Sequence, residues 1–235
     1  MATPIPITDK GLLRLMAWLS PSFPVGAYAY SHGAESAVEA GRVLNRDQAI
    51  DWITFILKHG AGRMDADLFV SAYLAAEEQD TPKYLEIAAQ ADALKGTNEL
   101  GLESRAQGQA FFDAVSAAWP NDRLYAITQV MKTQDVQPSY ATAVALAAAF
   151  AEVGLQAALG AYLHAFAANI TSAIVRLVPL GQTDGQKTIA ALEPVIEQAL
   201  AEALTRDRSD IGSAAFMVDW LSMQHETQYS RLFRS

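Results

Sequence analysis

Cysteine is absent from the 235 residues of this chain, and charged side chains are scarce. Without cysteine the chain cannot form a disulfide, a thiolate nucleophile, or a cysteine-ligated zinc or iron–sulfur site. Charged residues make up 18% of the sequence and hydrophobic residues 51%, so it is poorer in charge and richer in apolar side chains than an average soluble domain. This composition predicts a globular protein with a sizeable core and excludes a disordered chain.

Basic residues are in deficit. The chain has 17 Lys and Arg against 26 Asp and Glu, which gives a formal net charge of −9. A general binder of nucleic acids or anionic membranes needs a basic surface to neutralise phosphates, so the composition argues against both classes of partner. An acidic body favours protein partners instead.

The sequence also lacks clear targeting and membrane segments. Residues 1–7 have no positive stretch followed by an apolar run, so we expect no secretory signal and a cytoplasmic location. Residues 141–178 are apolar, but Glu152, His164 and Arg176 interrupt them and alanine supplies much of the apolarity. A membrane-spanning helix needs about 20 uninterrupted apolar residues, so closely packed soluble helices are the expected structure here.

No stretch alternates apolar and polar residues with β-branched enrichment for long enough to form a convincing strand. Helical spacing of apolar residues, capping residues and helix-ending Gly and Pro recur along the chain instead. We therefore predict an all-α fold. It consists of a single-domain bundle of about ten helices over residues 1–222 and an extended or flexible, partner-binding C-terminal tail over residues 223–235.

Some helix boundaries are predicted by single residues. Thr8 is a candidate cap for the first helix, Asn45 has the cap pattern for a later one, and Gly154 is expected to split the alanine-rich segment into two helices. The apolar residues expected on the buried stripe of the first helix are Leu12, Leu13, Leu15, Met16 and Leu19.

One stretch, residues 181–188, superficially resembles a phosphate-binding P-loop. A P-loop has four residues between its glycines and the second glycine directly before the lysine, so that successive N–H groups wrap the phosphates. Here only three residues separate Gly181 from Gly185, and Gln186 stands before Lys187. A turn between two helices is therefore favoured over nucleotide binding.

Catalytic and metal-binding patterns are equally weak. His32 and Glu35 lie three apart, but a di-iron bundle needs Glu-x-x-His on two helices and two further glutamates. Asp65 and Asp67 are too sparse for a magnesium-diphosphate motif, and no nucleophile-elbow motif is present. The sequence thus predicts no catalytic residue, cofactor or metal site, although an unrecognised all-α enzyme that uses His32, Glu35 or Asp65 stays open.

The last stretch, Met223–Ser235, mixes aromatic, amide and cationic side chains in one short run. Tyr, Phe and Arg are enriched where partners are gripped, which favours an interface. We expect Tyr229 and Phe233 to be its anchors, and Arg231 and Arg234 to bind partner carboxylates. The alternatives are a solvated tail and a terminal helix docked on its own domain.

Several stretches together resemble the UreF family of urease accessory proteins. They are LLRLMAWLSPSFPVGAYAYSHGAESAVEAG at 12–41, VRLVPLGQTDGQ at 175–186, and MQHETQYSRLFRS at 223–235, with a weaker match in ELGLESRAQG at 99–108. The matches occur in family order and are spaced over almost the whole chain. One departure is Gln224, because the family commonly has arginine there, so one cationic contact is expected to be missing.

The resemblance implies an all-α scaffold without enzymatic activity that acts in assembly of the nickel centre of urease. Its implied partners are UreD (also called UreH), the GTPase UreG and apo-urease, and a homodimer is expected, with no nucleic acid or membrane partner. A direct regulator of GTP hydrolysis by UreG stays open as an alternative. The residues that the resemblance assigns to partner binding are Pro24, Gly26, Tyr28, Tyr30, His225, Glu226, Tyr229, Arg231, Leu232, Phe233 and Arg234.

Overall fold

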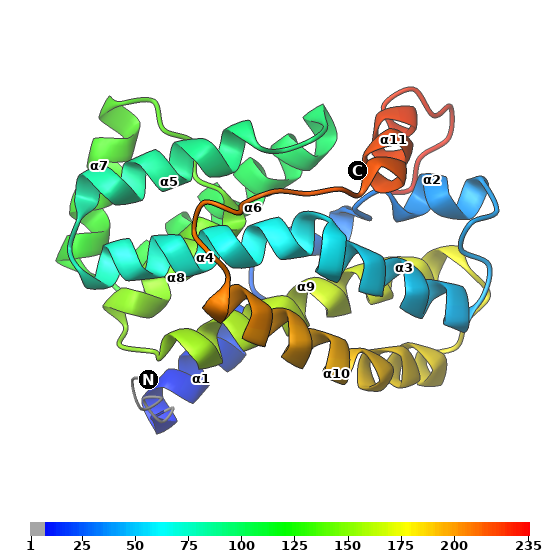
Figure 1. The fold of residues 1–235 in the computed structure, drawn as a ribbon, viewed down its shortest axis with the longest axis horizontal. Coiled ribbons are helices and arrows are strands. Elements are labelled where there is room, and N and C mark those ends of the chain that lie inside the picture. The colour runs from blue at the N-terminus through cyan, green and yellow to red at the C-terminus, as the bar shows by residue number, and fades with distance from the viewer. Residues whose placement is uncertain (1–7) are drawn as a thin grey trace.

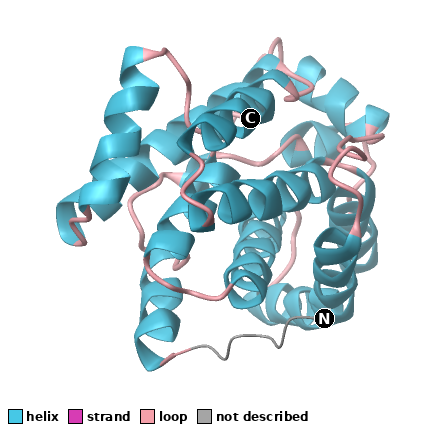
Figure 2. Cartoon of the chain, turned by 60° about the vertical axis from the view of Figure 1, so that its left-hand side comes forward, coloured by secondary structure: helices cyan, strands magenta, loops and turns pink. Residues whose placement is uncertain are grey.

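A computed structural model describes residues 8–235, and in that range helices are joined by turns and loops, with no strand (Figure 2). The all-α prediction is therefore confirmed. The elements are α1 (Asp9–Trp18), the short 3-10 helix η1 (Ala27–Ala29), α2 (Ala34–Glu39), α3 (Arg46–His59), α4 (Ala61–Glu77), α5 (Thr81–Ala93), α6 (Asn98–Ala118), α7 (Asp122–Thr133), α8 (Tyr140–Phe150), α9 (Leu155–Leu177), α10 (Gln182–Thr205) and α11 (Phe216–His225).

The core is built around α8. Every residue from 141 to 148 is buried, and most of them are alanine. A helix that is apolar all round belongs inside a protein, and small side chains allow its neighbours to approach closely. The helices α4, α6 and α9 pack against it, and α4 runs across the middle of the molecule (Figure 1).

A long irregular segment, residues 206–215, carries the chain from α10 to α11 (Figure 1). Arg206 forms an ion pair of 2.5 Å with Asp67 of α4, which fixes the start of this segment. Arg63, also on α4, donates to the main-chain oxygen of Gly212 at 2.9 Å. The segment therefore leads α11 to the end of the molecule where α2 lies, and α11 packs against α2 and α6.

The predicted buried stripe of α1 is wrong at three positions. Leu12, Leu13 and Met16 are exposed, whereas Leu15 is buried as expected. The helix buries Trp18 instead. The Trp18 ring packs edge-on against one aromatic ring of α6 and one that directly follows α6. Because α1 contacts the body only along a narrow strip, the side chains on either side of Leu15 and Trp18 stay in solvent.

The three predicted helix starts are confirmed. The Thr8 side chain accepts a hydrogen bond from the Gly11 N–H at 3.0 Å, and the Asn45 side chain accepts one from the Gln48 N–H at 3.0 Å. Both oxygens satisfy a donor that has no partner within the helix. Gly154 lies at the N-cap of α9, so the alanine-rich segment is divided there.

The helix α9 is long and apolar enough to cross a membrane by length and composition alone. Half of its most apolar window is buried within the fold, however, and α3, α4, α8 and α10 pack against it. Its apolarity is thus explained by its place in the core, as expected for residues 141–178.

Near the C-terminus, α11 continues through position 222. The predicted division between body and tail at that position therefore stays a prediction.

Candidate partner-binding site

The residues after α11 are irregular, but they are packed on the body of the same chain (Figure 1). The Arg234 N–H donates to the Ala29 oxygen at 2.8 Å, and the Ser31 N–H donates to the Ser235 oxygen at 2.8 Å. The Ser31 hydroxyl also donates to the Ser235 oxygen. Docking on its own domain is therefore what the structure shows, and the prediction of a flexible tail is not confirmed.

Glu35 of α2 holds the turn that follows α11. Its side chain accepts from the Leu232 N–H at 2.6 Å and from the Phe233 N–H at 2.9 Å. The same carboxylate lies 3.0 Å from Nε2 of His225. Glu35 is itself buried, so two backbone donors and one imidazole nitrogen from the end of the chain converge on one desolvated carboxylate.

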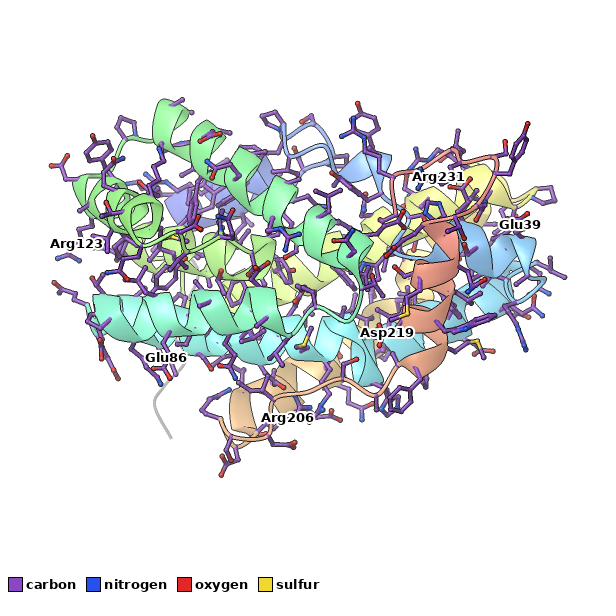
Figure 3. The ribbon with its side chains drawn as sticks, turned by 90° about the horizontal axis from the view of Figure 1, so that it is seen from above. Glu39, Glu86, Arg123, Arg206, Asp219 and Arg231 are labelled. Carbon is purple, nitrogen blue, oxygen red and sulfur yellow. The ribbon has the colours of Figure 1, made fainter. Side chains whose placement is uncertain are left out.

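Glu99 of α6 completes the arrangement from the opposite side. One of its oxygens lies 2.7 Å from Nδ1 of His225, and the other accepts from Nη1 of Arg231 at 3.0 Å. His225 is 0% exposed between the two carboxylates. We call Glu35, Glu99, His225 and Arg231 the tail clasp. Arg231 lies on the loop beside α11, at the end of the molecule that also carries Glu39 of α2 (Figure 3).

Local backbone geometry positions both carboxylates. Gly33 has φ +76° in the left-handed region that favours glycine, and α2 starts directly after it, with Glu35 in its first turn. Thr97 caps α6 by accepting from the Leu100 N–H at 3.1 Å, and its hydroxyl is 2.8 Å from that of Ser222 on α11. The cap of α6 is thereby fixed to α11, next to Glu99 in the first turn, where a helix dipole favours a negative charge.

Further contacts extend the docked surface beyond the clasp. The Ser235 hydroxyl donates to Glu103 at 2.8 Å. The ring of Phe233 is buried, and the guanidinium of Arg176 on α9 lies 4.4 Å from its centroid. Arg176 also donates to the main-chain oxygen of Tyr28 at 2.9 Å. One arginine therefore connects the tail to the segment that precedes α2.

The residues predicted for partner binding lie in the tail and in the segment before α2, and they include buried and exposed side chains. Tyr30, His225 and Phe233 are buried inside the chain. Arg231 is exposed but bonded to Glu99. The exposed members without a side-chain bond in the described part of the chain are Pro24, Tyr28, Glu226, Tyr229, Leu232 and Arg234, and Gly26 has φ +73° in the turn between them.

Sequence reasoning missed the roles of Glu35, Glu99 and Arg176. The sequence pattern pairs Glu35 with His32, but its actual partner, His225, lies 190 positions away. No local spacing signals such a pair. The nearest signal in the sequence is one glutamate in the first turn of each of two helices, set against a histidine and arginines in the last stretch.

The residues of the alternative enzyme hypothesis do not form a substrate-sized site. His32 and Asp65 line a cavity of about 30 Å³, but Glu35 does not. This is room for a water molecule or two. Asp65 is bonded to Lys95 at 2.6 Å and to the Tyr162 hydroxyl at 3.0 Å. Within residues 8–235 no group of three or more potential metal ligands is arranged around a common point.

Comparison with known proteins agrees with this picture. The family model UreF matches residues 43–193. A protein of Granulibacter bethesdensis named urease accessory protein UreF is 44% identical over 227 residues, covering 97% of this chain and 95% of the relative. A protein of the same name from Rhodopseudomonas palustris strain BisA53 is 46% identical over 224 residues, covering 95% and 93%.

The chain belongs to the UreF family. The resemblance predicted from the quoted stretches is thereby confirmed. A relative from Rhodopseudomonas palustris strain TIE-1 is 44% identical over 235 residues and aligns over the whole of this UreF-family chain, so the aligned region includes the tail, which lies outside the span of the family model. The relatives are named as accessory proteins, a name that fits a non-catalytic role.

Proposed function

We propose that this UreF-family protein is a non-catalytic scaffold in assembly of the nickel centre of urease, and that its docked tail forms the surface that binds UreD. The relatives' printed name, urease accessory protein, supports the general role. The observation that carries the finer proposal is the tail clasp. It holds an irregular segment in one arrangement and leaves Tyr229 and Leu232 exposed on it, while Tyr28 is exposed on η1.

A docked tail suits this role because the ordering cost is already met before the partner arrives. A segment that folds only on binding loses part of its interaction energy to ordering. Here the buried residues of the tail contact the body, while large exposed side chains remain for a partner. Tyrosine supplies much contact area with few rotatable bonds, so Tyr28 and Tyr229 are the proposed anchors.

The wider complex follows from the same proposal. The scaffold carries UreD, recruits the GTPase UreG, docks on apo-urease in the cytoplasm and forms a homodimer through its helical body. Coupling between this complex and GTP hydrolysis by UreG is part of the proposal. The test compares the rate of GTP hydrolysis by UreG in the presence of UreD with the rate in the presence of UreD and this protein. Identical rates would contradict the coupling.

The binding surface is tested by capture of tagged UreD. The double variant Tyr229→Ala, Leu232→Ala removes two exposed side chains and no clasp contact. Loss of central anchor residues typically costs at least about 2 kcal/mol, so capture should weaken about thirtyfold. The control is Tyr125→Ala, an exposed tyrosine on α7 at the opposite end of the molecule (Figure 1).

Unchanged capture by the double variant, or equal weakening by Tyr125→Ala, would contradict the proposed surface. Point variants are preferable to a truncation after Met223. Removing the whole tail would leave Glu35 and Glu99 without the donors they hold in the structure. A truncated protein could then lose capture through rearrangement around two buried carboxylates rather than through loss of contact.

A further inference from the structure

The tail clasp contains a contact that requires an extra proton. His225 places Nδ1 2.7 Å from a Glu99 oxygen and Nε2 3.0 Å from a Glu35 oxygen. Each of these contacts needs a hydrogen between nitrogen and oxygen, because two lone pairs facing each other repel. A neutral imidazole carries one N–H and can satisfy only one of the two carboxylates.

The second hydrogen has two possible positions. Either the ring is an imidazolium that donates to both glutamates, or one glutamate is protonated and donates to the ring. In both cases the docked clasp holds one proton more than a neutral histidine with two ionised glutamates. The need for this proton comes from the geometry and is the same whichever atom carries it.

The surrounding charges do not remove this need. On α2 the other acidic residue, Glu39, is exposed. On α6, Glu103 is 3.6 Å from Nδ1 of His32 and accepts from Ser235, and Arg105 pairs with Asp92.

The tail and α11 add few charges around the clasp. Arg231 binds the Glu99 oxygen that does not face His225. On α11 itself Asp219 lies six positions before His225, and the adjacent Glu226 is exposed. His225 is the group placed between the two carboxylates, so the extra proton lies in one of its two contacts with them.

We propose that docking of the tail is coupled to uptake of this proton, so that raising the pH above neutrality releases the segment after α11. A histidine in water loses its proton near pH 6.5. Once the proton leaves the clasp, a ring lone pair faces a carboxylate at a histidine that is 0% exposed to solvent. The buried polar pair is then unsatisfied, and exchange of the tail contacts for water becomes favourable.

The consequence for partner binding rests on the proposed function. If the docked tail is the surface that binds UreD, the clasp makes that surface available at neutral pH and withdraws it as the pH rises. Release also separates Phe233 from Arg176 and the Ser235 oxygen from Ser31, so the whole docked surface is lost together. The proton thus regulates the docking of the whole segment after α11.

Release can be measured on the isolated full-length protein. Because the chain has no cysteine, the substitution Leu232→Cys gives a single site for a nitroxide spin label. The Leu232 side chain is 65% exposed, while its N–H is held by Glu35. A label there reports backbone docking without occupying the clasp. Electron paramagnetic resonance then separates slow, docked labels from fast, released ones.

The expected result is a rise in the ratio of released to docked label between pH 6.5 and pH 9.5. At pH values where the docked form holds the extra proton and the released form does not, the ratio of released to docked label rises by about tenfold per pH unit. A label placed by Tyr125→Cys on α7 should show no such change, and the helical circular-dichroism signal should stay constant. A flat profile at position 232 would overturn the proposal.

Two variants distinguish the proton from a general loosening of the tail. With His225→Gln, the amide NH2 can face only one of the two glutamates and its carbonyl oxygen faces the other at any pH, so the tail should be released already at pH 6.5. With Glu99→Gln, the amide N–H can donate to the unprotonated ring while its oxygen still accepts from Arg231, so the tail should stay docked at pH 9.5. A wild-type pH profile in either variant would contradict the assignment.

Failure of the proposed function gives a different result. Capture of UreD by the unlabelled wild-type protein is measured at pH 6.5, where the tail is docked. No capture there would overturn the proposed function, whereas the spin-label profile tests the proton without any partner present. Capture at pH 6.5 that is lost at pH 9.5, together with pH-independent capture by Glu99→Gln, supports both.

Discussion

The middle of α8 and the His225–glutamate contacts of the tail clasp are both buried, yet they are held by opposite means. Residues 141–148 pack small apolar side chains against α4, α6 and α9. The clasp instead brings two carboxylates, an imidazole and a guanidinium together at one end of the molecule. Apolar side chains carry no titrating group and lose stability where a gap opens, whereas the clasp depends on a complete set of donors and acceptors.

This difference has a consequence for stability. A defect at α8 has no way to be relieved short of unfolding, because the helix is enclosed. A defect in the clasp can be relieved by release of about ten residues into water. The core should therefore set the global free energy of unfolding, and the clasp should set a local equilibrium of lower free energy.

The largest expected effect is a cavity at the core. Leu146 on α8 is 0% exposed, so Leu146→Ala should lower the free energy of unfolding by about 2–5 kcal/mol. Urea denaturation followed by circular dichroism measures it. Leu13→Ala on α1, where the side chain is 67% exposed, is the control and should change stability by less than about 0.5 kcal/mol. Similar losses in both variants would contradict the claim that the core sets the global free energy of unfolding.

Alkaline pH should weaken the core by a smaller step. Burial raises the pKa of Tyr84 and of Tyr162 above the ordinary value of 10. The pKa of each tyrosine is higher in the folded state than in the unfolded state. Each tyrosine's contribution to the free energy of unfolding is therefore complete below pH 10 and is lost as the pH rises above 10. The loss is about 1.4 kcal/mol per tyrosine and pH unit.

The measurement is urea denaturation at pH 9, 10 and 11. Tyr84→Phe removes one titrating hydroxyl, and with it the 3.3 Å hydrogen bond to the Thr142 oxygen. The variant should be slightly less stable at pH 9 and should lose stability less steeply above pH 10. An unchanged slope would show that Tyr84 is not protected from ionisation in the folded protein.

The smallest effect is expected at the border of the clasp. Arg176→Ala removes the contact with the Phe233 ring and the bond to the Tyr28 oxygen. Docking of the tail should weaken by about 1–2 kcal/mol, roughly five- to thirtyfold, as measured by hydrogen exchange of the Phe233 amide. Arg123→Ala, which removes a similar contact with Phe150 on the far side of the molecule, should leave that amide protected.

The fold was predictable because its signals are local. Thr8, Asn45 and Gly154 mark helix starts through bonds within a few residues or through backbone freedom, and the structure confirms them. The predicted buried stripe of α1 was wrong because periodicity shows that a helix is amphipathic but not how much of its surface contacts the body. Leu12 and Met16 lie at apolar positions of a helix that touches the body only near Leu15.

The site was predictable in position but not in construction. The aromatic and cationic composition of residues 223–235 singled out the tail. Its fixation by Glu35 and Glu99 joins residues more than 120 positions apart. The resemblance marked Gln224 as a departure that removes a cationic contact, and Gln224 is exposed, outside the clasp. That departure therefore leaves the docking contacts intact and bears only on the outer surface.

The most direct test of the docked surface is capture of UreD by a variant changed only beneath it. Glu35→Ala removes the acceptor for the Leu232 and Phe233 N–H groups and for His225. Glu39→Ala, on the same helix but exposed, is the control (Figure 3). We predict that Glu35→Ala keeps its helical spectrum but weakens capture at least about thirtyfold, while Glu39→Ala does not. Wild-type capture by Glu35→Ala, with the amides of Leu232 and Phe233 exchanging freely, would contradict a role for the docked tail in binding.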